Sequence, residues 1–258
     1  MKNKINEIIK DLDKVIELNP KDAVAYFKRG NAYQEIKQYD KAIEDYNKVI
    51  KLNPNARVYN NRGVAYLNLE QYDKAISDYT KAIELNPNYA MIYKSRGDAY
   101  LYLLQYDEAI SDYTKAIELD PGYLNAYFSR GDVYYDLELY TKAIKDYTKV
   151  IELNPEYSDA YINRGNGYYY IKQYDKAIGD FNKAIKINPN IAEYYSNRGS
   201  AYKDIGEYEK AIADLTEAIE LDPNFGYAYL NRGLVYKKLG LEDKAQKDFE
   251  MYEKLKEE

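Results

Sequence analysis

Two kinds of short amphipathic segment alternate along the chain. The first has apolar side chains three and four residues apart around an Arg-Gly pair, as in VAYFKRGNAYQEI at 24–36. The second has the same spacing with an acidic residue near its start, as in YDKAISDYTKAIEL at 72–85. Both spacings predict amphipathic helices. An Asn-Pro or Asp-Pro step then follows and predicts a helix end, because the residue before proline disfavours helical backbone.

This helix, turn, helix and break pattern recurs at a fixed interval. The glycine of the Arg-Gly pair stands at 30, 63, 97, 131, 165, 199 and 233, so the interval is 33 residues once and 34 afterwards. The seven prolines keep the same spacing. Two short helices cannot bury their apolar faces alone, so neighbouring pairs must stack. We therefore predict an all-α solenoid of stacked antiparallel helix pairs. It forms one domain over 1–258, with a partial repeat at 1–22 and repeats at 23–55, 56–89, 90–123, 124–157, 158–191, 192–225 and 226–258.

The repeat resembles that of a known family. Residues 90–123 carry Tyr93, Gly97, Tyr100, Ala109, Tyr113, Ala116 and Pro121. This pattern is similar to the tetratricopeptide repeat, and the match covers 23–258. The resemblance implies a right-handed superhelical solenoid that binds protein or peptide partners in a concave groove lined by the first helix of each repeat. The chain departs from the family in one respect, since Arg precedes every repeat glycine where Leu is usual.

Each of these arginines has a candidate partner. An Asp stands fifteen residues after every repeat glycine. Because a partly buried guanidinium needs a partner, we predict that each Arg bonds an Asp of the same or the adjacent repeat. The alternative is that these are unrelated surface charges. The arginines are Arg29, Arg62, Arg96, Arg130, Arg164, Arg198 and Arg232, and the aspartates are Asp45, Asp78, Asp112, Asp146, Asp180, Asp214 and Asp248.

Tyrosine is unusually frequent, with 34 residues. Most lie four before or three after the repeat glycine, at the start of the second helix, or one residue after the recurring Asp, and these positions suit helix packing. Five others share a different face of the first helices, and the resemblance implies that this face lines the groove. They are Tyr102, Tyr135, Tyr169, Tyr170 and Tyr227. The alternative is that they cover exposed surface or pack on one another.

The groove face combines aromatic and apolar side chains with carboxylates and amides. Aromatic rings beside carboxylates suit a partner segment with apolar and basic side chains. Asn residues two before a glycine are similar to the asparagine ladder with which some family members hold extended peptides, and the alternative is that they are solvated. The family's chaperone-tail clamp lacks its cations here, so we predict none. The candidate partner-binding residues are Asn61, Asp98, Leu101, Tyr102, Phe128, Asp132, Tyr135, Asp136, Ile162, Asn163, Asn166, Tyr169, Tyr170, Asn197 and Asn231.

Composition narrows the functional classes. The chain has no Cys and no His, which excludes thiolate chemistry and removes the commonest general base and metal ligand. A net charge of -6 disfavours nucleic acid and anionic lipid as partners. We therefore predict a cytoplasmic, non-catalytic scaffold for a protein or peptide partner, with no cofactor, no metal, no nucleic acid and no membrane. The alternative is a structural scaffold that self-assembles into a homo-oligomer through the solenoid ends or edges.

One junction between repeats is irregular. In NPNARVYNNRG at 53–63, the chain from Pro54 to Gly63 is one residue shorter than at every other junction. This shortening predicts a tighter or re-angled joint between the first two repeats.

Overall fold

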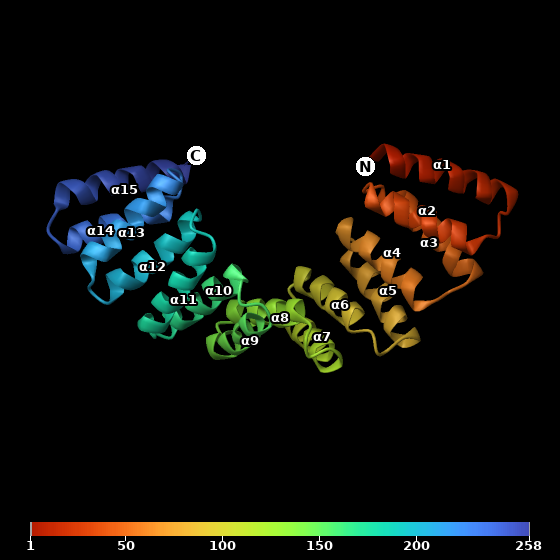
Figure 1. The fold of residues 1–258 in the computed structure, drawn as a ribbon, viewed down its shortest axis with the longest axis horizontal. Helices are drawn as coiled ribbons and strands as arrows, with labels where there is room; N and C mark the ends of the chain where they lie inside the picture. Colours follow the sequence, from red (N-terminus) through yellow and green to blue (C-terminus); the bar gives the residue numbers. More distant parts are fainter. Residues whose placement is uncertain (1, 258) are drawn as a thin grey trace. The chain divides into compact units, whose positions relative to one another are not determined.

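The computed structural model describes residues 2–257, which form fifteen α-helices and no strand (Figure 1). The first helices of the repeats are α2 (Ala23–Glu35), α4 (Ala56–Asn68), α6 (Ala90–Tyr102), α8 (Leu124–Asp136), α10 (Ser158–Tyr170), α12 (Ala192–Asp204) and α14 (Gly226–Lys238). The second helices are α3 (Tyr39–Leu52), α5 (Tyr72–Leu85), α7 (Tyr106–Leu119), α9 (Tyr140–Leu153), α11 (Tyr174–Ile187), α13 (Tyr208–Leu221) and α15 (Glu242–Glu257), and α1 (Lys2–Leu18) precedes them all. The predicted all-α architecture of alternating first and second helices is confirmed.

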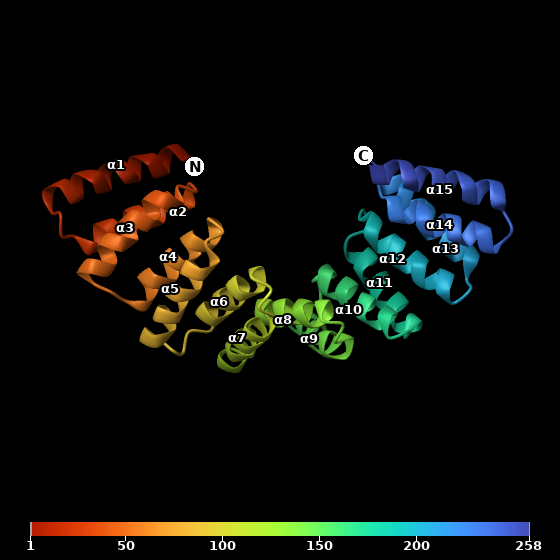
Figure 2. The ribbon, with the colours of Figure 1, turned by 180° about the vertical axis from the view of Figure 1, so that it is seen from behind.

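The chain forms two compact units, residues 1–133 (unit 1) and 134–258 (unit 2). The boundary falls near the end of α8. Within each unit, successive helices run antiparallel and lie side by side in both views (Figures 1 and 2). Each unit therefore builds its core between neighbouring helix pairs.

The turn inside each repeat needs a residue with left-handed backbone. Gly206 and Gly240 take this conformation in the last two repeats, with φ of 84° and 70°. Five earlier repeats place a side-chain-bearing residue there, such as Lys37 with φ of 62°. The next amide, that of Gln38, donates to the carbonyl of Tyr33 at 2.8 Å, which satisfies a carbonyl that the helix end leaves free.

The repeat glycine is required by close helix contact. A Cβ atom built on Gly165 would lie 2.5 Å from Cε1 of Phe181, on the second helix of the same repeat. The equivalent contact at Gly63 is 2.8 Å from Cε1 of Tyr79, a side chain with no exposed area. Gly costs roughly 1 kcal/mol against Ala inside a helix. The absence of a side chain lets the bulky aromatic ring fit, and its burial offsets that cost.

The Arg–Asp pairs that the sequence predicts are present in six repeats. In each, Nε and Nη2 of the arginine donate to the two carboxylate oxygens of an aspartate on the second helix of the same repeat, at 2.6–2.8 Å. The pairs are Arg29–Asp45, Arg62–Asp78, Arg96–Asp112, Arg164–Asp180, Arg198–Asp214 and Arg232–Asp248. The pairing of Arg130 with Asp146, which lie in different units, stays a prediction.

The same arginines also connect neighbouring repeats. The remaining nitrogen of Arg164, Nη1, donates to the hydroxyl of Thr148 on the second helix of the preceding repeat at 3.1 Å. The rings of Tyr161 and Tyr168 flank the guanidinium, with their centroids 5.8 and 5.9 Å from Cζ. The tyrosines four before and three after the glycine therefore do more than fill space, because they also form cation–π contacts with a buried charge. Each of the six paired arginines makes such a bond to the preceding second helix, or to α1 in the case of Arg29, and so joins three helices.

Candidate functional site

Helices of unit 2, chiefly first helices, line a cavity of about 230 Å³ that is open to solvent. Its walls come from α8, α10, α11, α12 and α14. Six of the residues that the sequence places on the groove face line it together: Tyr135, Asn166, Tyr169, Tyr170, Asn197 and Asn231. Side chains that are distant in sequence therefore meet at one place because equivalent positions of successive repeats lie side by side.

Three tyrosines of the cavity lining, Tyr135, Tyr169 and Tyr170, belong to a larger cluster of aromatic rings. Tyr170 is 54 % exposed and stacks on Tyr140, with centroids 4.9 Å apart and planes inclined by 5°. Tyr135 meets both rings edge-on, at 5.8 Å from Tyr170 and 5.4 Å from Tyr140. Tyr169 contacts Tyr170 and Tyr174 edge-on, at 5.8 and 5.5 Å. We call these five residues the tyrosine cluster. The alternative that the groove tyrosines pack on one another is thus met for these three, and they also pack on tyrosines at the starts of second helices.

Hydroxyl groups of the cluster are held as neutral donors. Tyr169 donates its hydroxyl proton to Oδ2 of Asp204 at 2.6 Å. Burial, reinforced by this carboxylate, raises the pKa of Tyr169 above its ordinary value. Burial and the neighbouring Tyr170 raise the pKa of Tyr135 in the same way. Both groups therefore stay protonated into the alkaline range, and the cluster offers aromatic faces without adding charge.

The amides beside the cluster form short hydrogen-bonded links. Asn197 donates Nδ2 to Oδ1 of Asn166 at 3.2 Å, which joins α12 to α10. Asn231 accepts from Nζ of Lys203 at 2.8 Å and donates to the carbonyl of Tyr227 at 3.1 Å. Within residues 2–257, Nδ2 of Asn166 and Oδ1 of Asn197 have no partner, so one donor and one acceptor are unused on residues that line the same cavity. A peptide unit needs one of each.

In unit 1, the predicted groove residues are arranged differently. Tyr102 is 63 % exposed and stacks on Tyr72, with centroids 5.0 Å apart. Asn61 donates to Asn31 at 2.9 Å and repeats the amide link of unit 2. Leu101 is half-buried against the core of its repeat. The aromatic and amide pattern therefore recurs, but unit 1 lacks a tyrosine cluster of the same size among its described residues.

The predicted carboxylates differ in availability. Asp98 accepts from the hydroxyl of Tyr113 at 2.9 Å and from Nζ of Lys94 at 2.7 Å, so both of its oxygens are engaged within its own repeat. Because these bonds already occupy the carboxylate, Asp98 is less available to contact a partner than the sequence suggested. Asp136 is exposed, whereas Phe128, Asp132 and Asn163 are half-buried.

One predicted groove residue lies in the core. Ile162 is 4 % exposed and packs with Ala177, Phe181 and Tyr194. Its position, three before the repeat glycine, lies between the exposed face and the packed face of α10. Phe181 of α11 and Tyr194 of α12 lie in the same core cluster and cover the Ile162 side chain. Its side chain therefore does not reach a partner on the surface.

Sequence reasoning missed three residues of the cavity wall, namely Phe181, Glu193 and Ser200. Phe181 belongs to a second helix and has no exposed area, so its pattern indicates only a core residue. Glu193 and Ser200 lie six before and one after a repeat glycine, at positions of the predicted groove face. That register was the signal by which both could have been found.

Comparison with family models decides the identity of the fold. A tetratricopeptide repeat model matches residues 23–55, 56–89, 124–157 and 158–191. The chain belongs to the tetratricopeptide repeat family. Further models of the same repeat match 97–138 and 199–240, then 78–111 and 181–213, and finally 226–258.

Solved structures agree with this assignment. A crystal structure of MamA is 31% identical, with 62% of this chain and 94% of that chain covered and a TM-score of 0.59. YrrB, whose structure is described as a TPR protein with an unusual peptide-binding site, is 27% identical, with coverage of 69% and 92% and a TM-score of 0.60. The C-terminal part of a TPR repeat-containing protein from Cytophaga hutchinsonii shares the fold at 22% identity, with coverage of 89% and 95% and a TM-score of 0.74.

One further comparison and one observation on the helices complete the picture. The comparison with curated proteins gave no match. None of the helices within residues 2–257 combines the length and the apolar character that crossing a bilayer requires. Family membership and the solved relatives support a protein-interaction scaffold.

Proposed function

We propose that this chain is a non-catalytic scaffold that binds an extended peptide segment of a partner protein on the first helices of unit 2. The observation that carries the proposal is the cavity where the tyrosine cluster meets the linked amides of Asn166 and Asn197. Aromatic side chains supply large contact area at low conformational cost. The unused donor and acceptor match the backbone of an extended peptide, whose N–H and C=O groups are not hydrogen-bonded within the peptide itself.

The charges near the cavity favour a segment with apolar and basic side chains. Glu193 lines the cavity and is exposed, and Asp136 is exposed next to Tyr135. Tyrosine faces attract cations through the ring quadrupole, and nearby carboxylates add to that attraction. An apolar side chain would bury area against the rings, and a Lys or Arg would lie between rings and carboxylates. YrrB, a relative with the same fold, is described as having a peptide-binding site.

Affinity capture with matched variants tests this proposal. The test variant is Tyr135→Ala/Tyr169→Ala/Tyr170→Ala, and the control is Tyr89→Ala, which removes an exposed tyrosine from unit 1 outside the predicted groove residues. We expect partner polypeptides captured from the source organism by wild type and control to be lost with the test variant. Circular dichroism confirms that both variants are folded. Equal capture by all three proteins would contradict the proposal.

A milder variant separates loss of contacts from loss of packing. Asn166→Ala/Asn197→Ala removes the amide link and leaves the tyrosine cluster in place. We expect weaker capture, because the peptide backbone would lose its donor and acceptor. Light scattering on the same proteins tests the alternative function. A dominant wild-type oligomer that the triple variant dissociates would favour self-assembly instead of peptide binding.

A further inference from the structure

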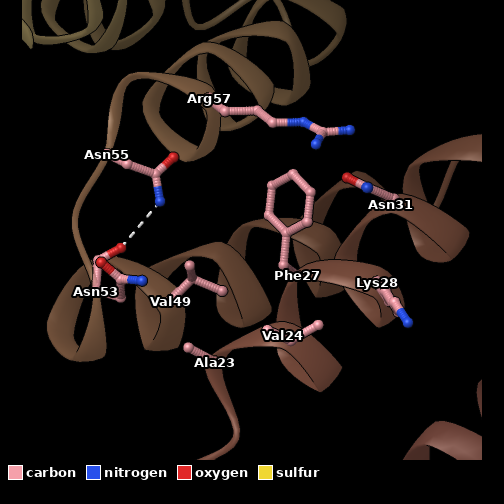
Figure 3. A pocket seen from close by; sticks show the side chains of 9 residues that line it. All are labelled: Ala23, Val24, Phe27, Lys28, Asn31, Val49, Asn53, Asn55 and Arg57. Atoms are coloured by element: carbon pink, nitrogen blue, oxygen red, sulfur yellow. Dashed lines mark hydrogen bonds between the residues drawn. The ribbon is translucent and has the colours of Figure 1, made fainter.

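The junction between the first two repeats leaves a pocket of about 380 Å³ in unit 1 (Figure 3). We call it the seam pocket, since it lies where α2 and α3 meet the start of α4. Its lining residues are Ala23, Val24, Phe27, Lys28, Asn31, Val49, Asn53, Asn55 and Arg57. This site lies in unit 1, so it goes beyond the function proposed for unit 2.

The pocket follows from the shortened junction. Eight residues before the repeat glycine, the later repeats carry a large apolar side chain: Tyr89, Tyr123, Tyr157, Ile191 and Phe225. Tyr123 and Phe225 pack against the buried cores of their junctions. The second repeat has Asn55 at this place, and its amide accepts from the backbone of Val58 and donates to the carbonyl of Asn53, both at 3.1 Å. The amide caps α4 instead of filling the seam. The seam therefore lacks a large side chain at this place, while the expected tighter or re-angled joint stays a prediction.

The floor of the seam pocket is apolar. Val49 is buried, Phe27 is half-buried, and Val24 is 62 % exposed. Figure 3 shows the Phe27 ring standing between these aliphatic side chains and Arg57. An apolar side chain placed here would cover Val24 and the ring edge, and that burial is favourable.

The rim of the pocket carries positive charge without a counter-charge. Arg57 is the only one of the eight arginines outside an Arg-Gly pair. Its Cζ lies 5.0 Å from the Phe27 centroid, and within residues 2–257 it forms no ion pair or hydrogen bond. Lys28 adds a second cation without such a partner within the same residues. A guanidinium held over a ring with its donors free is suited to a carboxylate, which it binds with two parallel hydrogen bonds.

The side-chain amide of Asn31 offers a further hydrogen-bond donor in the same pocket as Arg57. Oδ1 of Asn31 accepts from the hydroxyl of Tyr46 at 2.8 Å and from Asn61 at 2.9 Å. Its Nδ2 group has no partner within residues 2–257, so it can donate to a ligand oxygen. The two accepted bonds fix the orientation of the amide, which prepares this donor before binding.

We propose that the seam pocket binds an acidic side chain of a partner polypeptide together with a neighbouring apolar side chain. The carboxylate pairs with Arg57, and the apolar side chain lies on Val24 and Phe27. Charge complementarity selects this occupant, because the rim is cationic although the chain as a whole carries a net charge of -6. The carboxylate is a side-chain group, so a free chain terminus is not required.

Peptide display on the intact protein tests the proposal. A library of peptides without a free C-terminus is selected on immobilised wild-type protein, and each enriched peptide is resynthesised with an amidated end for fluorescence polarisation. We expect enrichment of peptides that contain Asp or Glu next to an aromatic or aliphatic residue. We expect the affinity of these peptides to fall at least about tenfold with Arg57→Gln, as loss of a charged hydrogen-bonded pair implies. Lys48→Gln, which removes an exposed cation from α3 outside the pocket, should leave it unchanged.

A variant that fills the seam pocket distinguishes binding in the pocket from a general effect of charge. Asn55→Tyr installs the residue type that later repeats carry and keeps every charge. We expect it to abolish binding of the selected peptides while the helical content of the protein is preserved. The proposal is overturned if selection yields no acidic peptide, if Arg57→Gln binds the selected peptides as wild type does, or if Asn55→Tyr leaves their affinity unchanged.

Discussion

Removing one member of an Arg–Asp pair should lower the free energy of unfolding far more than removing both. We develop this prediction for Arg164 and Asp180, which lie within unit 2. Arg164→Met keeps the aliphatic length of the side chain and removes its five donors. It leaves the Asp180 side chain, only 9% exposed, without the two bonds of 2.7 Å that satisfy its oxygens.

The expected magnitude follows from the surroundings of the pair. An uncompensated buried charge costs roughly 3–5 kcal/mol. Loss of the bond from Arg164 to Thr148 and of the contacts with Tyr161 and Tyr168 adds to this, on the order of 1 kcal/mol in total. Arg164→Met/Asp180→Leu removes the stranded charge, so its unfolding free energy should return to within about 2 kcal/mol of wild type. The coupling free energy between the two positions is then at least about 2 kcal/mol.

Urea unfolding followed by circular dichroism provides the assay. The four proteins of the double-mutant cycle are wild type, Arg164→Met, Asp180→Leu and the double variant. We expect both single variants to have lower unfolding midpoints than the double variant. If the two single effects simply add up in the double variant, the pair does not act as a unit and the reasoning from burial is wrong.

Three further outcomes are expected. Gly165→Ala should lower the unfolding free energy by about 1–2 kcal/mol in the same urea assay, because the overlap of its Cβ with Phe181 outweighs the better helix propensity of Ala. Gly179→Ala is the control, since a Cβ there meets open space, and it should raise the unfolding free energy by about 0.5–1 kcal/mol. Burial raises the pKa of Tyr46 and Tyr113 above the unfolded value of about 10, so the stability that they contribute is complete below pH ~10 and is lost as the pH rises toward the folded values. Absorbance at 295 nm should accordingly show a fraction of tyrosines that ionises only together with unfolding, and a single smooth titration of all tyrosines would contradict this. Asn55→Ala should lower the unfolding free energy by about 1 kcal/mol through loss of the α4 cap, measured by urea unfolding against Lys48→Ala.

The sequence predicted the repeat, its helices and six of the Arg–Asp pairs that the structure shows. These features depend on register alone, because every repeat places the same residue types at the same positions. Asp180 lies on the second helix of its repeat sixteen residues after Arg164, and the geometry of a helix pair brings both to the same level. A strict repeat therefore makes such contacts readable from one sequence.

Contacts that differ between repeats could not be predicted in the same way. Ile162 lies at a position that is buried or half-exposed depending on the neighbouring helix, so its place on the helix face did not decide its exposure. Asp98 is engaged because Tyr113 and Lys94 both reach it, which register does not reveal. The seam pocket depends on Asn55, which stands where later repeats carry a large apolar side chain. A pattern of helices does not predict the volume of a pocket.

Photo-crosslinking at the tyrosine cluster tests the central claim most directly. Tyr170, which is exposed on α10, is replaced by p-benzoyl-L-phenylalanine, and the matched control carries this residue at Lys183, exposed on the second helix α11. The proteins are irradiated in extract of the source organism, and mass spectrometry identifies the joined peptides. Peptide binding on the first helices predicts crosslinks to a partner polypeptide from position 170 and none from position 183. Crosslinks from position 183 alone, or equal crosslinks from both positions, would contradict the account.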